Sequence, residues 1–291
     1  MRCGAVVVGL VAIAACGDGG GDAPPDPTDR PTDRIDDDIA RLAGARELTP
    51  GVQIADRFGG AGRGAARDWL AEQLAAIGFA TEIVDYDTGG NVLGRLPATD
   101  GGTAWVVVGA HFDSVRGCPG ANDNATGVAV ALAVARALVS LPDRRRGALV
   151  AFFDEEEAGL IGSTQVAKGL VGTDVVAVHT VDQVGWDEDG DQVLEIERPT
   201  DALYAEYEAA ADELAMAVRR TDTGGTDHVA FRDRGYAAAG VTEEYAGGDT
   251  TPHRHEPGDT YDTVDVDYAI AAARLVTRVV SREVAAESWR P

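Results

Sequence analysis

The sequence predicts an α/β fold of three layers, in which helices flank both faces of a central mixed, mainly parallel sheet. Short, continuously apolar segments such as residues 105–110 (WVVVGA) and 147–153 (GALVAFF) indicate strands that are buried on both faces. Segments with helical spacing of apolar residues alternate with them along the chain. This alternation is typical of parallel strands that are connected by covering helices.

The individual elements follow from local patterns. In residues 65–77, apolar side chains recur every three or four positions and the pattern stops before Gly78, which is a common residue just after a helix. Asp265 can cap a final helix. The remaining predicted elements are a helix over 125–140, a strand over 174–181, a helix from about Asp201 to Val218 and a strand near 236–242.

The glycine-rich residues 58–70 superficially resemble a phosphate-binding loop. No predicted strand precedes them, and their spacing fits neither the dinucleotide nor the nucleotide-phosphate motif. We therefore expect a loop that leads into a helix and no cofactor site.

The N-terminus predicts an exported protein. Arg2 precedes an apolar segment that is long enough for a signal peptide and too short to cross a bilayer. The segment ends in a sequence that resembles the lipobox of bacterial lipoproteins, which would make Cys16 a lipidated N-terminus at the outer face of a membrane; an ordinary secretory signal or a buried strand are the alternatives. We expect a signal peptide over 1–15, a disordered Gly/Pro/Asp-rich tether over 16–34 and one domain over 35–291.

Charge and cysteine content narrow the classes of partner. The net charge is −24 and Lys168 is the only lysine, which argues against nucleic acid and anionic lipid as partners. Of three cysteines, Cys3 lies in the signal and Cys16 would carry lipid, so Cys118 has no disulfide partner. We expect a monomer that is either a cell-envelope lipoprotein or secreted.

Polar residues follow several predicted strands, where open α/β sheets bind their ligands. His111 and Asp113 come directly after the strand over 105–110. Because they are two residues apart on extended backbone, both side chains face one way, and Asp113 could accept the second ring N–H of His111. That would leave the other ring nitrogen free for a metal, although a solvated strand end is the alternative for this motif alone.

Five further segments add imidazole or carboxylate groups. Asp123 lies in a turn before an apolar helix, where it could also be a helix cap. The others are the acidic run Asp154–Glu157, Asp182, the pair Asp227 and His228, and the group His253, His255 and Asp259. A two-metal hydrolytic site needs such an inventory, and a set without thiolate fits zinc best, with manganese or cobalt as alternatives.

The order of these motifs resembles a known family over roughly residues 53–285. GAHFDSV, GANDNATG, EEAGLIGS, VDQVG, TDHVAF and HEPGDTYD are similar to motifs of the secreted di-zinc aminopeptidases of the leucyl aminopeptidase type, whose relatives include glutamate carboxypeptidases and glutaminyl cyclases. The resemblance implies two Zn²⁺ ions, Glu156 as general base and Asp113 as the partner of His111. It implies these ligands: His111 and Asp182 for one ion, Glu157 and His255 for the other, and Asp123 as the bridge.

Some positions depart from the family pattern. Thr180 and Gln183 stand where the family has Asn and Met, and Arg254 stands where many relatives have a tyrosine that polarises the substrate carbonyl. Arg254, Tyr245 or the zinc ions alone could take that role. The resemblance places Asp227 and His228 near the site as candidate substrate contacts.

The expected function is a zinc-dependent aminopeptidase that acts on peptides with a free N-terminus. A glutaminyl cyclase-like acyltransferase with one zinc, a carboxypeptidase or dipeptidase, and an inactive binding domain are the alternatives. For the remaining residues we expect His179 to be a hydrogen-bonded core histidine, Cys118 to be a small loop residue, and Asp154 and Glu155 to be solvated or supporting acids.

Overall fold

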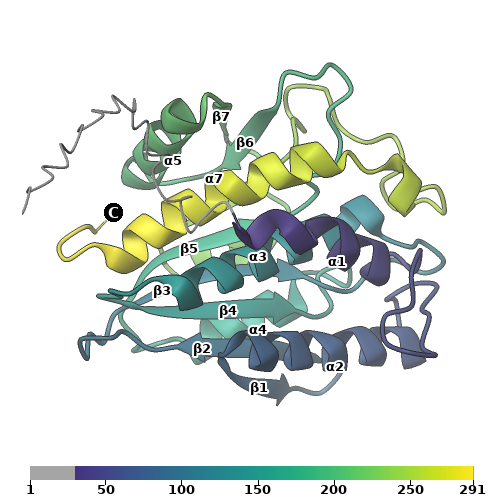
Figure 1. Cartoon of the computed structure of the whole chain (residues 1–291), viewed down its shortest axis with the longest axis horizontal. Coiled ribbons are helices and arrows are strands. Elements are labelled where there is room, and N and C mark those ends of the chain that lie inside the picture. The colour runs from purple at the N-terminus through teal and green to yellow at the C-terminus, as the bar shows by residue number, and fades with distance from the viewer. Residues whose placement is uncertain (1–29, 291) are drawn as a thin grey trace, which may run out of the picture.

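The computed structural model describes residues 30–290, and an eight-stranded sheet runs through its middle (Figure 1). The strand order is β1-β2-β4-β3-β5-β8-β6-β7. The strands are β1 Ala80–Asp85, β2 Gly90–Leu96, β3 Trp105–His111, β4 Gly147–Phe153, β5 Val175–Val181, β6 Val193–Glu197, β7 Ala217–Thr221 and β8 Ala238–Thr242.

The sheet is mixed, with a parallel centre. Strands β4, β3, β5 and β8 are parallel neighbours, so their carboxyl ends meet at one edge. Strands β1 and β2 add an antiparallel hairpin on one side, and β6 and β7 form a parallel pair that joins β8 in the antiparallel sense. The predicted mixed, mainly parallel sheet is therefore confirmed.

Helices cover both faces of the sheet. The helices are η1 Arg30–Arg34, α1 Ile35–Leu42, α2 Gly60–Ile77, η2 Ala121–Thr126, α3 Gly127–Ser140, α4 Ile161–Gly169, α5 Asp201–Leu214, α6 His228–Arg232, η3 Tyr261–Thr263 and α7 Val266–Ala285. Helices α1, α2, α3, α5 and α7 share one hydrophobic core with one face of the sheet, and α4 and α6 share the second core with the other face. The structure thus has the three predicted layers.

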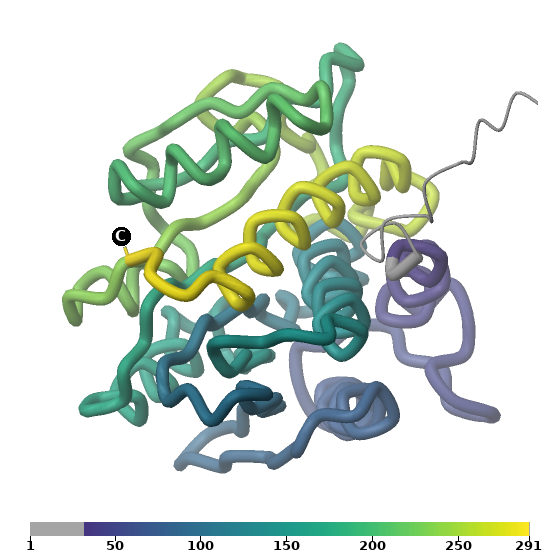
Figure 2. Tube along the Cα trace, turned by 60° about the vertical axis from the view of Figure 1, so that its left-hand side comes forward, coloured from purple at the N-terminus to yellow at the C-terminus, as the bar shows by residue number. Residues whose placement is uncertain are grey.

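Helix α3 lies in the centre of the larger helical layer, beside α1 and α7 (Figure 2). It contacts β3 below and α1, α2 and α7 around it, which explains why it is apolar on most sides. Together with η2 it is long and apolar enough to cross a membrane, but 83% of that window is buried inside the protein. Its composition is therefore that of a core helix.

The structure corrects the predicted helix from Asp201 to Val218. Helix α5 ends at Leu214, Ala215 takes a left-handed φ of 54°, and β7 begins at Ala217. As an edge strand that is mostly exposed, β7 lacks the apolar pattern of the central strands. Strands β1, β2 and β6 and the short helices α1, α4 and α6 were not predicted either.

The glycine-rich segment is also more helical than predicted. Helix α2 begins at Gly60, five residues before the predicted start at Ala65. A Cβ at Gly62 would lie 2.2 Å from the carbonyl oxygen of Asp56, so the backbone approach there requires glycine. Among the described residues, the element before α2 is the helix α1 and not a strand.

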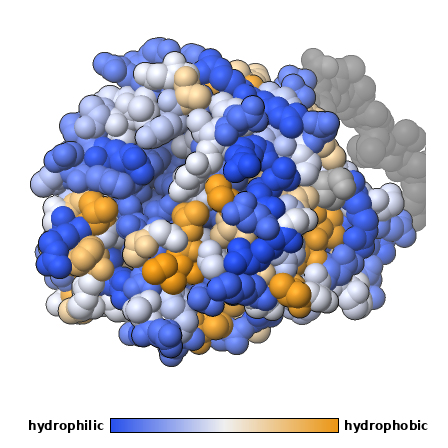
Figure 3. All heavy atoms as spheres, turned by 180° about the vertical axis from the view of Figure 1, so that it is seen from behind, coloured by the Kyte–Doolittle hydropathy of each residue, from blue (hydrophilic) through white to orange (hydrophobic). Residues whose placement is uncertain are grey.

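The predicted signal peptide and Cys16 lie outside the described residues. Arg30–Arg34, which the sequence placed in the tether, form the helix η1 directly before α1. Helical structure thus precedes the predicted domain boundary at Ile35. Seen from behind, the surface is mostly hydrophilic with scattered apolar spots, as the high net charge suggests (Figure 3).

Candidate metal centre

The predicted metal ligands meet at the carboxyl edge of the parallel strands. His111 is the last residue of β3, Glu157 follows β4 and Asp182 follows β5. Asp123 lies in η2, and His255 lies in the loop between β8 and η3. The parallel register pairs His111 with Phe153, which places the segments after β3 and β4 side by side.

The donor atoms form two groups that share Asp123. In the first group, His111 Nε2 lies 3.3 Å from both Asp123 Oδ1 and Asp182 Oδ1. In the second group, His255 Nε2 lies 2.9 Å from Glu157 Oε2 and 3.3 Å from Asp123 Oδ2. Within each group the donor atoms lie within 4.8 Å of one another, so each could hold one metal ion.

The chemistry of the two groups fits bound cations. Asp123 Oδ2 and Glu157 Oε1 are buried and have no hydrogen-bond donor among the described residues, which is costly unless a cation satisfies them. Burial, followed by the Asp123 carboxylate, raises the pKa of Glu157 to about 7. Imidazole and carboxylate donors are the set that zinc accepts in hydrolytic sites. The residues present therefore fit zinc.

Asp113 connects two segments of the site. Its Oδ1 lies 3.4 Å from His111 Nδ1, on the ring side away from the donor group. It also accepts backbone hydrogen bonds from Glu156 at 3.0 Å and Glu157 at 3.2 Å. One buried carboxylate thus lies beside the imidazole and fixes the backbone of the acidic run.

Glu156 lines the cavity beside the donor groups, together with Asp123 and Asp182. Burial raises the pKa of Glu156 to about 9; the nearby His111 opposes this shift, and Asp227 and Asp182 add to it. A carboxyl group of this kind can exchange a proton near neutral pH once a cation lies beside it.

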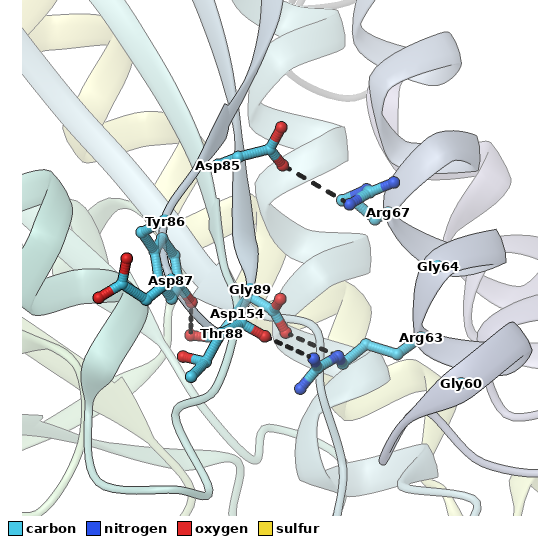
Figure 4. Close-up of a pocket in the computed structure, with 10 residues that line it drawn as sticks. All are labelled: Gly60, Arg63, Gly64, Arg67, Asp85, Tyr86, Asp87, Thr88, Gly89 and Asp154. Atoms are coloured by element: carbon cyan, nitrogen blue, oxygen red, sulfur yellow. Dashed lines mark hydrogen bonds and ion pairs between the residues drawn. The ribbon is translucent and has the colours of Figure 1, made fainter.

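Of the other two acids of the run, Asp154 points the opposite way, toward α2 and the hairpin of β1 and β2 (Figure 4). The hydrogen bond from Thr88 places Glu155 on the same side. Asp154 accepts a hydrogen bond from the Gly90 N–H at 3.0 Å and lies 3.5 Å from Arg63 Nε. Glu155 lies 3.3 Å from Arg63 Nη1 and accepts a 2.5 Å hydrogen bond from Thr88. Both acids are buried, so they support the run and are not solvated.

The backbone at Glu155 separates the two pairs of acids. Its φ of 57° lies in the left-handed region, which residues other than glycine adopt rarely. The chain therefore turns between Asp154, which faces the hairpin, and Glu157, which faces the donor groups. Four adjacent like charges are divided between Arg63 on one side and the metal centre on the other.

Two of the four predicted substrate contacts line the cavity, and the other two do not. Tyr245 and Arg254 line the cavity, and Arg254 Nε lies 3.7 Å from Asp123 Oδ2. Asp227 and His228 are buried and do not line it. Asp227 influences the charge of Glu156, and His228 lies 3.5 Å from Glu197, so both can act on a substrate only through those neighbours.

Two buried residues that the sequence did not single out for this role hold the loops of the site. The Arg57 guanidinium is fully buried and donates hydrogen bonds to the carbonyl oxygens of Leu42, Phe112, Pro119 and Gly120. Asp259 accepts the backbone N–H of Asn122 at 2.7 Å and of Asp123 at 3.0 Å. An isolated arginine that bonds to backbone gives no sequence signal, whereas Asp259 belonged to a noted motif.

The remaining candidates lie outside the donor groups. His179 is buried and bonds to Tyr207 at 2.8 Å and Glu283 at 2.7 Å, as expected for a core histidine. Cys118 is buried beside Asp259, and burial raises the pKa of its thiol to about 12. His253 packs edge-on against the Trp186 ring, so His255, as predicted, is the histidine of the donor group.

The fold and this site define an α/β protein with a candidate two-metal hydrolytic centre. Residues 91–280 match the sequence profile of peptidase family M28. Because the match covers more than half of the chain, the chain belongs to that family, and the predicted resemblance is confirmed.

Individual relatives agree with this family. The chain is 30% identical over 195 residues to aminopeptidase YwaD from Bacillus subtilis, which covers 62% of this chain and 42% of that protein. It is 27% identical to the solved structure of BSAP, a zinc aminopeptidase from Bacillus subtilis, with a TM-score of 0.65 over 69% of this chain and 51% of the other. The chain spans about half the length of the first curated relatives it matches.

More distant structures share the fold. LapB from Legionella pneumophila superposes with a TM-score of 0.80 at 20% identity, over 89% of this chain and 74% of that chain. A glutaminyl cyclase from Porphyromonas gingivalis superposes with a TM-score of 0.73 at 19% identity, over 87% of this chain and 98% of that chain. The fold alone therefore does not separate peptidase from cyclase.

Proposed function

We propose that this protein is a zinc-dependent aminopeptidase that binds two zinc ions. The observation that carries the proposal is the pair of donor groups that share the Asp123 carboxylate. His111 and Asp182 would hold one ion, Glu157 and His255 the other, and Asp123 would bridge them. When bound, the two ions would supply a water of lowered pKa and polarise the carbonyl of the scissile bond.

Glu156 is the proposed general base. Its side chain lines the cavity beside both donor groups, and its backbone N–H is held by Asp113. In this role Glu156 takes a proton from the attacking water and later gives it to the leaving amine. Asp113 holds the His111 ring and the Glu156 backbone in fixed relative positions during both steps.

The charge of the cavity favours an aminopeptidase over a carboxypeptidase. Asp123, Glu156, Asp182 and Glu197 line it, and Arg254 is the one basic lining residue among those described. Two zinc ions would balance the carboxylates that hold them, whereas Glu156 and Glu197 hold neither ion and remain as acceptors for a cationic group of the substrate. The free N-terminus of a peptide therefore fits the cavity better than its C-terminus.

Arg254 is the proposed hydrogen-bond donor to the substrate carbonyl. It lines the cavity, and its guanidinium lies 6.0 Å from the centre of the Tyr245 ring, which helps to hold it in place. In this position Arg254 polarises the substrate carbonyl, as the tyrosine at this place does in many relatives. Tyr245 is then a support for Arg254.

The alternative is a single-zinc glutaminyl cyclase, because such an enzyme shares the fold. Hydrolysis of aminoacyl p-nitroanilides, measured with added zinc and after chelation, tests the proposal together with metal analysis. Two zinc ions per chain and hydrolysis that N-acetylation abolishes would support it. One zinc ion together with cyclisation of N-terminal glutamine would replace it by the cyclase.

Export and lipid attachment at Cys16 are part of the proposal and rest on the sequence alone. In a bacterial host, metabolic labelling with a palmitate analogue would label the native chain and leave the variant Cys16→Ser unlabelled. Labelling of that variant would remove Cys16 as the attachment site.

A further inference from the structure

The cavity beside the metal centre has a polar wall that the proposed mechanism does not use. It has a volume of about 310 Å³ and extends from Asp123, Glu156 and Asp182 to Glu197. Glu197 is the last residue of β6, which is separated from β5 by the single strand β8. At the usual spacing of strands, Glu197 lies roughly 10 Å to the side of the strand that carries Asp182.

The backbone makes room for the Glu197 carboxylate. A Cβ at Gly240, its partner on β8, would lie 2.7 Å from Glu197 Oε2 and 2.7 Å from His228 Nδ1. The hydroxyl of Thr226 donates a hydrogen bond to the same oxygen at 3.3 Å. Only 4% of Glu197 is exposed, yet it forms part of the cavity wall.

Glu197 has no cationic partner among the described residues. Its one ion-pair contact is His228 at 3.5 Å, and burial, aided by Arg198 and Arg232, lowers the pKa of that histidine to about 4. His228 is therefore neutral near pH 7. Arg198 is exposed and forms no ion pair with Glu197. A buried carboxylate without a cation is costly, and a cation entering the cavity would offset that cost.

The same wall contains no large aliphatic side chain. Beyond the metal-centre residues it consists of these: Gln183, Glu197, Thr223, Gly224, Gly225, Thr226, Thr242, Tyr245 and Arg254. No Leu, Ile, Val, Met or Phe is among them. A pocket for leucine is lined by apolar groups, because burying a hydrocarbon against unpaired polar atoms gains little.

We propose that this cavity receives the side chain of the substrate's first residue and that Glu197 binds the ammonium or guanidinium at its end. The inference rests on the proposed aminopeptidase function and names its substrate class, peptides that begin with lysine or arginine.

The rates of hydrolysis of a matched substrate series test this inference. Lysyl, arginyl, leucyl and methionyl p-nitroanilides are compared by kcat/KM in the zinc-loaded protein. We expect the two basic substrates to be about 10-fold or more better than the two apolar ones. In Glu197→Gln, kcat/KM for the basic substrates falls by about 10- to 100-fold, and that for the apolar substrates changes less than about 3-fold.

The variant Glu72→Gln is the control. Glu72 is exposed on α2 and does not line the cavity. We expect its preference for basic substrates to equal that of the wild type. If Glu197→Gln does not fold, kcat/KM for the same four substrates is compared between Glu197→Asp and the wild type.

Two results would overturn the inference. One is a wild-type preference for leucine or methionine. The other is an equal loss on all four substrates in Glu197→Gln, which would mean that Glu197 binds the α-ammonium group or only supports the fold. If no aminoacyl substrate is hydrolysed even with zinc, the proposed function itself fails, and this inference fails with it.

Discussion

Asp113 Oδ1 accepts a 3.0 Å hydrogen bond from the backbone N–H of Glu156, forty-three residues later in the chain. The same carboxylate lies beside the His111 ring, so one side chain aligns a metal-ligand candidate with the proposed base. The loops after β3 and β4 are therefore a single unit at the edge of the sheet. The proposed chemistry would depend on that alignment as well as on the proposed ligands.

The variant Asp113→Asn should weaken zinc binding without removing it. An amide keeps an oxygen for the Glu156 N–H but lacks the charge that makes His111 a stronger ligand. We expect zinc affinity to fall by about 10- to 100-fold, as measured by competition with a fluorescent chelator. Unchanged affinity would show that Asp113 does not act on His111.

The variant Glu156→Gln should keep both metal ions and lose activity. Glu156 belongs to neither donor group, so its amide leaves the proposed ligands intact. We expect kcat to fall by about 10²- to 10⁴-fold while zinc content, measured by mass spectrometry, stays at the wild-type value. Glu208→Gln, an exposed position on α5, is the control and should change neither quantity. Near-normal turnover in Glu156→Gln would remove Glu156 from the mechanism.

The variant Arg63→Met should destabilise the folded protein, because Arg63 contacts the acidic run on the side away from the donor groups. Arg63 contacts the buried Asp154 and Glu155, and its removal leaves both with fewer charged partners. We expect the free energy of unfolding in urea to fall by about 1–3 kcal/mol, with a loss of activity. Arg67→Met, one helical turn later in the same cavity of about 450 Å³, removes only pairs with exposed acids and should cost less than about 1 kcal/mol (Figure 4). Equal effects of the two variants would contradict the supporting role of Arg63.

Stability should fall as the pH is lowered from about 6.5 to about 4 because of His228. Burial lowers the pKa of its ring from 6.5 to about 4. Between these values the unfolded chain binds a proton that the folded protein excludes, so the free energy of unfolding decreases with decreasing pH. The full effect is about 3 kcal/mol at 1.36 kcal/mol per pKa unit.

Urea unfolding of the chelator-treated protein at pH 7 and pH 4.5 measures this effect. The wild type should lose more stability between the two pH values than His228→Gln does, because glutamine does not titrate. Comparing the two proteins cancels the contribution of the many carboxylates. An identical loss in both would show that His228 is not the group responsible.

Zinc should stabilise the protein in proportion to its binding. A ligand that binds only the folded state raises the melting temperature as its concentration exceeds the dissociation constant. We expect added zinc to raise the melting temperature and EDTA to reverse the rise. In Asp123→Asn, which weakens both donor groups at once, the shift should be much smaller.

Much of the centre of this protein is predictable from the sequence, because its strands are apolar on both faces. Strands β3, β4, β5 and β8 have continuous apolar runs, and the predicted ligands that follow three of them lie together. Strands β1 and β7 are exposed, and β6 is short, so their patterns are weak. Glu197 was not singled out because its strand was not predicted.

The features that the sequence did not predict depend mostly on contacts between distant segments. The pairing of Arg63 with Glu155 joins residues ninety-two positions apart, and no local pattern marks either one as a partner of the other. The family resemblance separates Glu156 and Glu157 from Asp154 and Glu155, but no sequence pattern shows what the second pair contacts. The turn at Glu155 and the position of α2 give the two pairs their different surroundings.

Arg57 gives the metal centre a positive charge that no chelator can remove. Among the described residues its guanidinium bonds only to carbonyl oxygens and forms no direct ion pair, and its charge acts on the nearby Asp259, Asp113 and Asp123. The loops that carry the ligands are thus held by a permanent internal counter-ion. Loss of zinc would then leave a folded protein with an intact receptor for the metal, and inactivation by a chelator would be reversible.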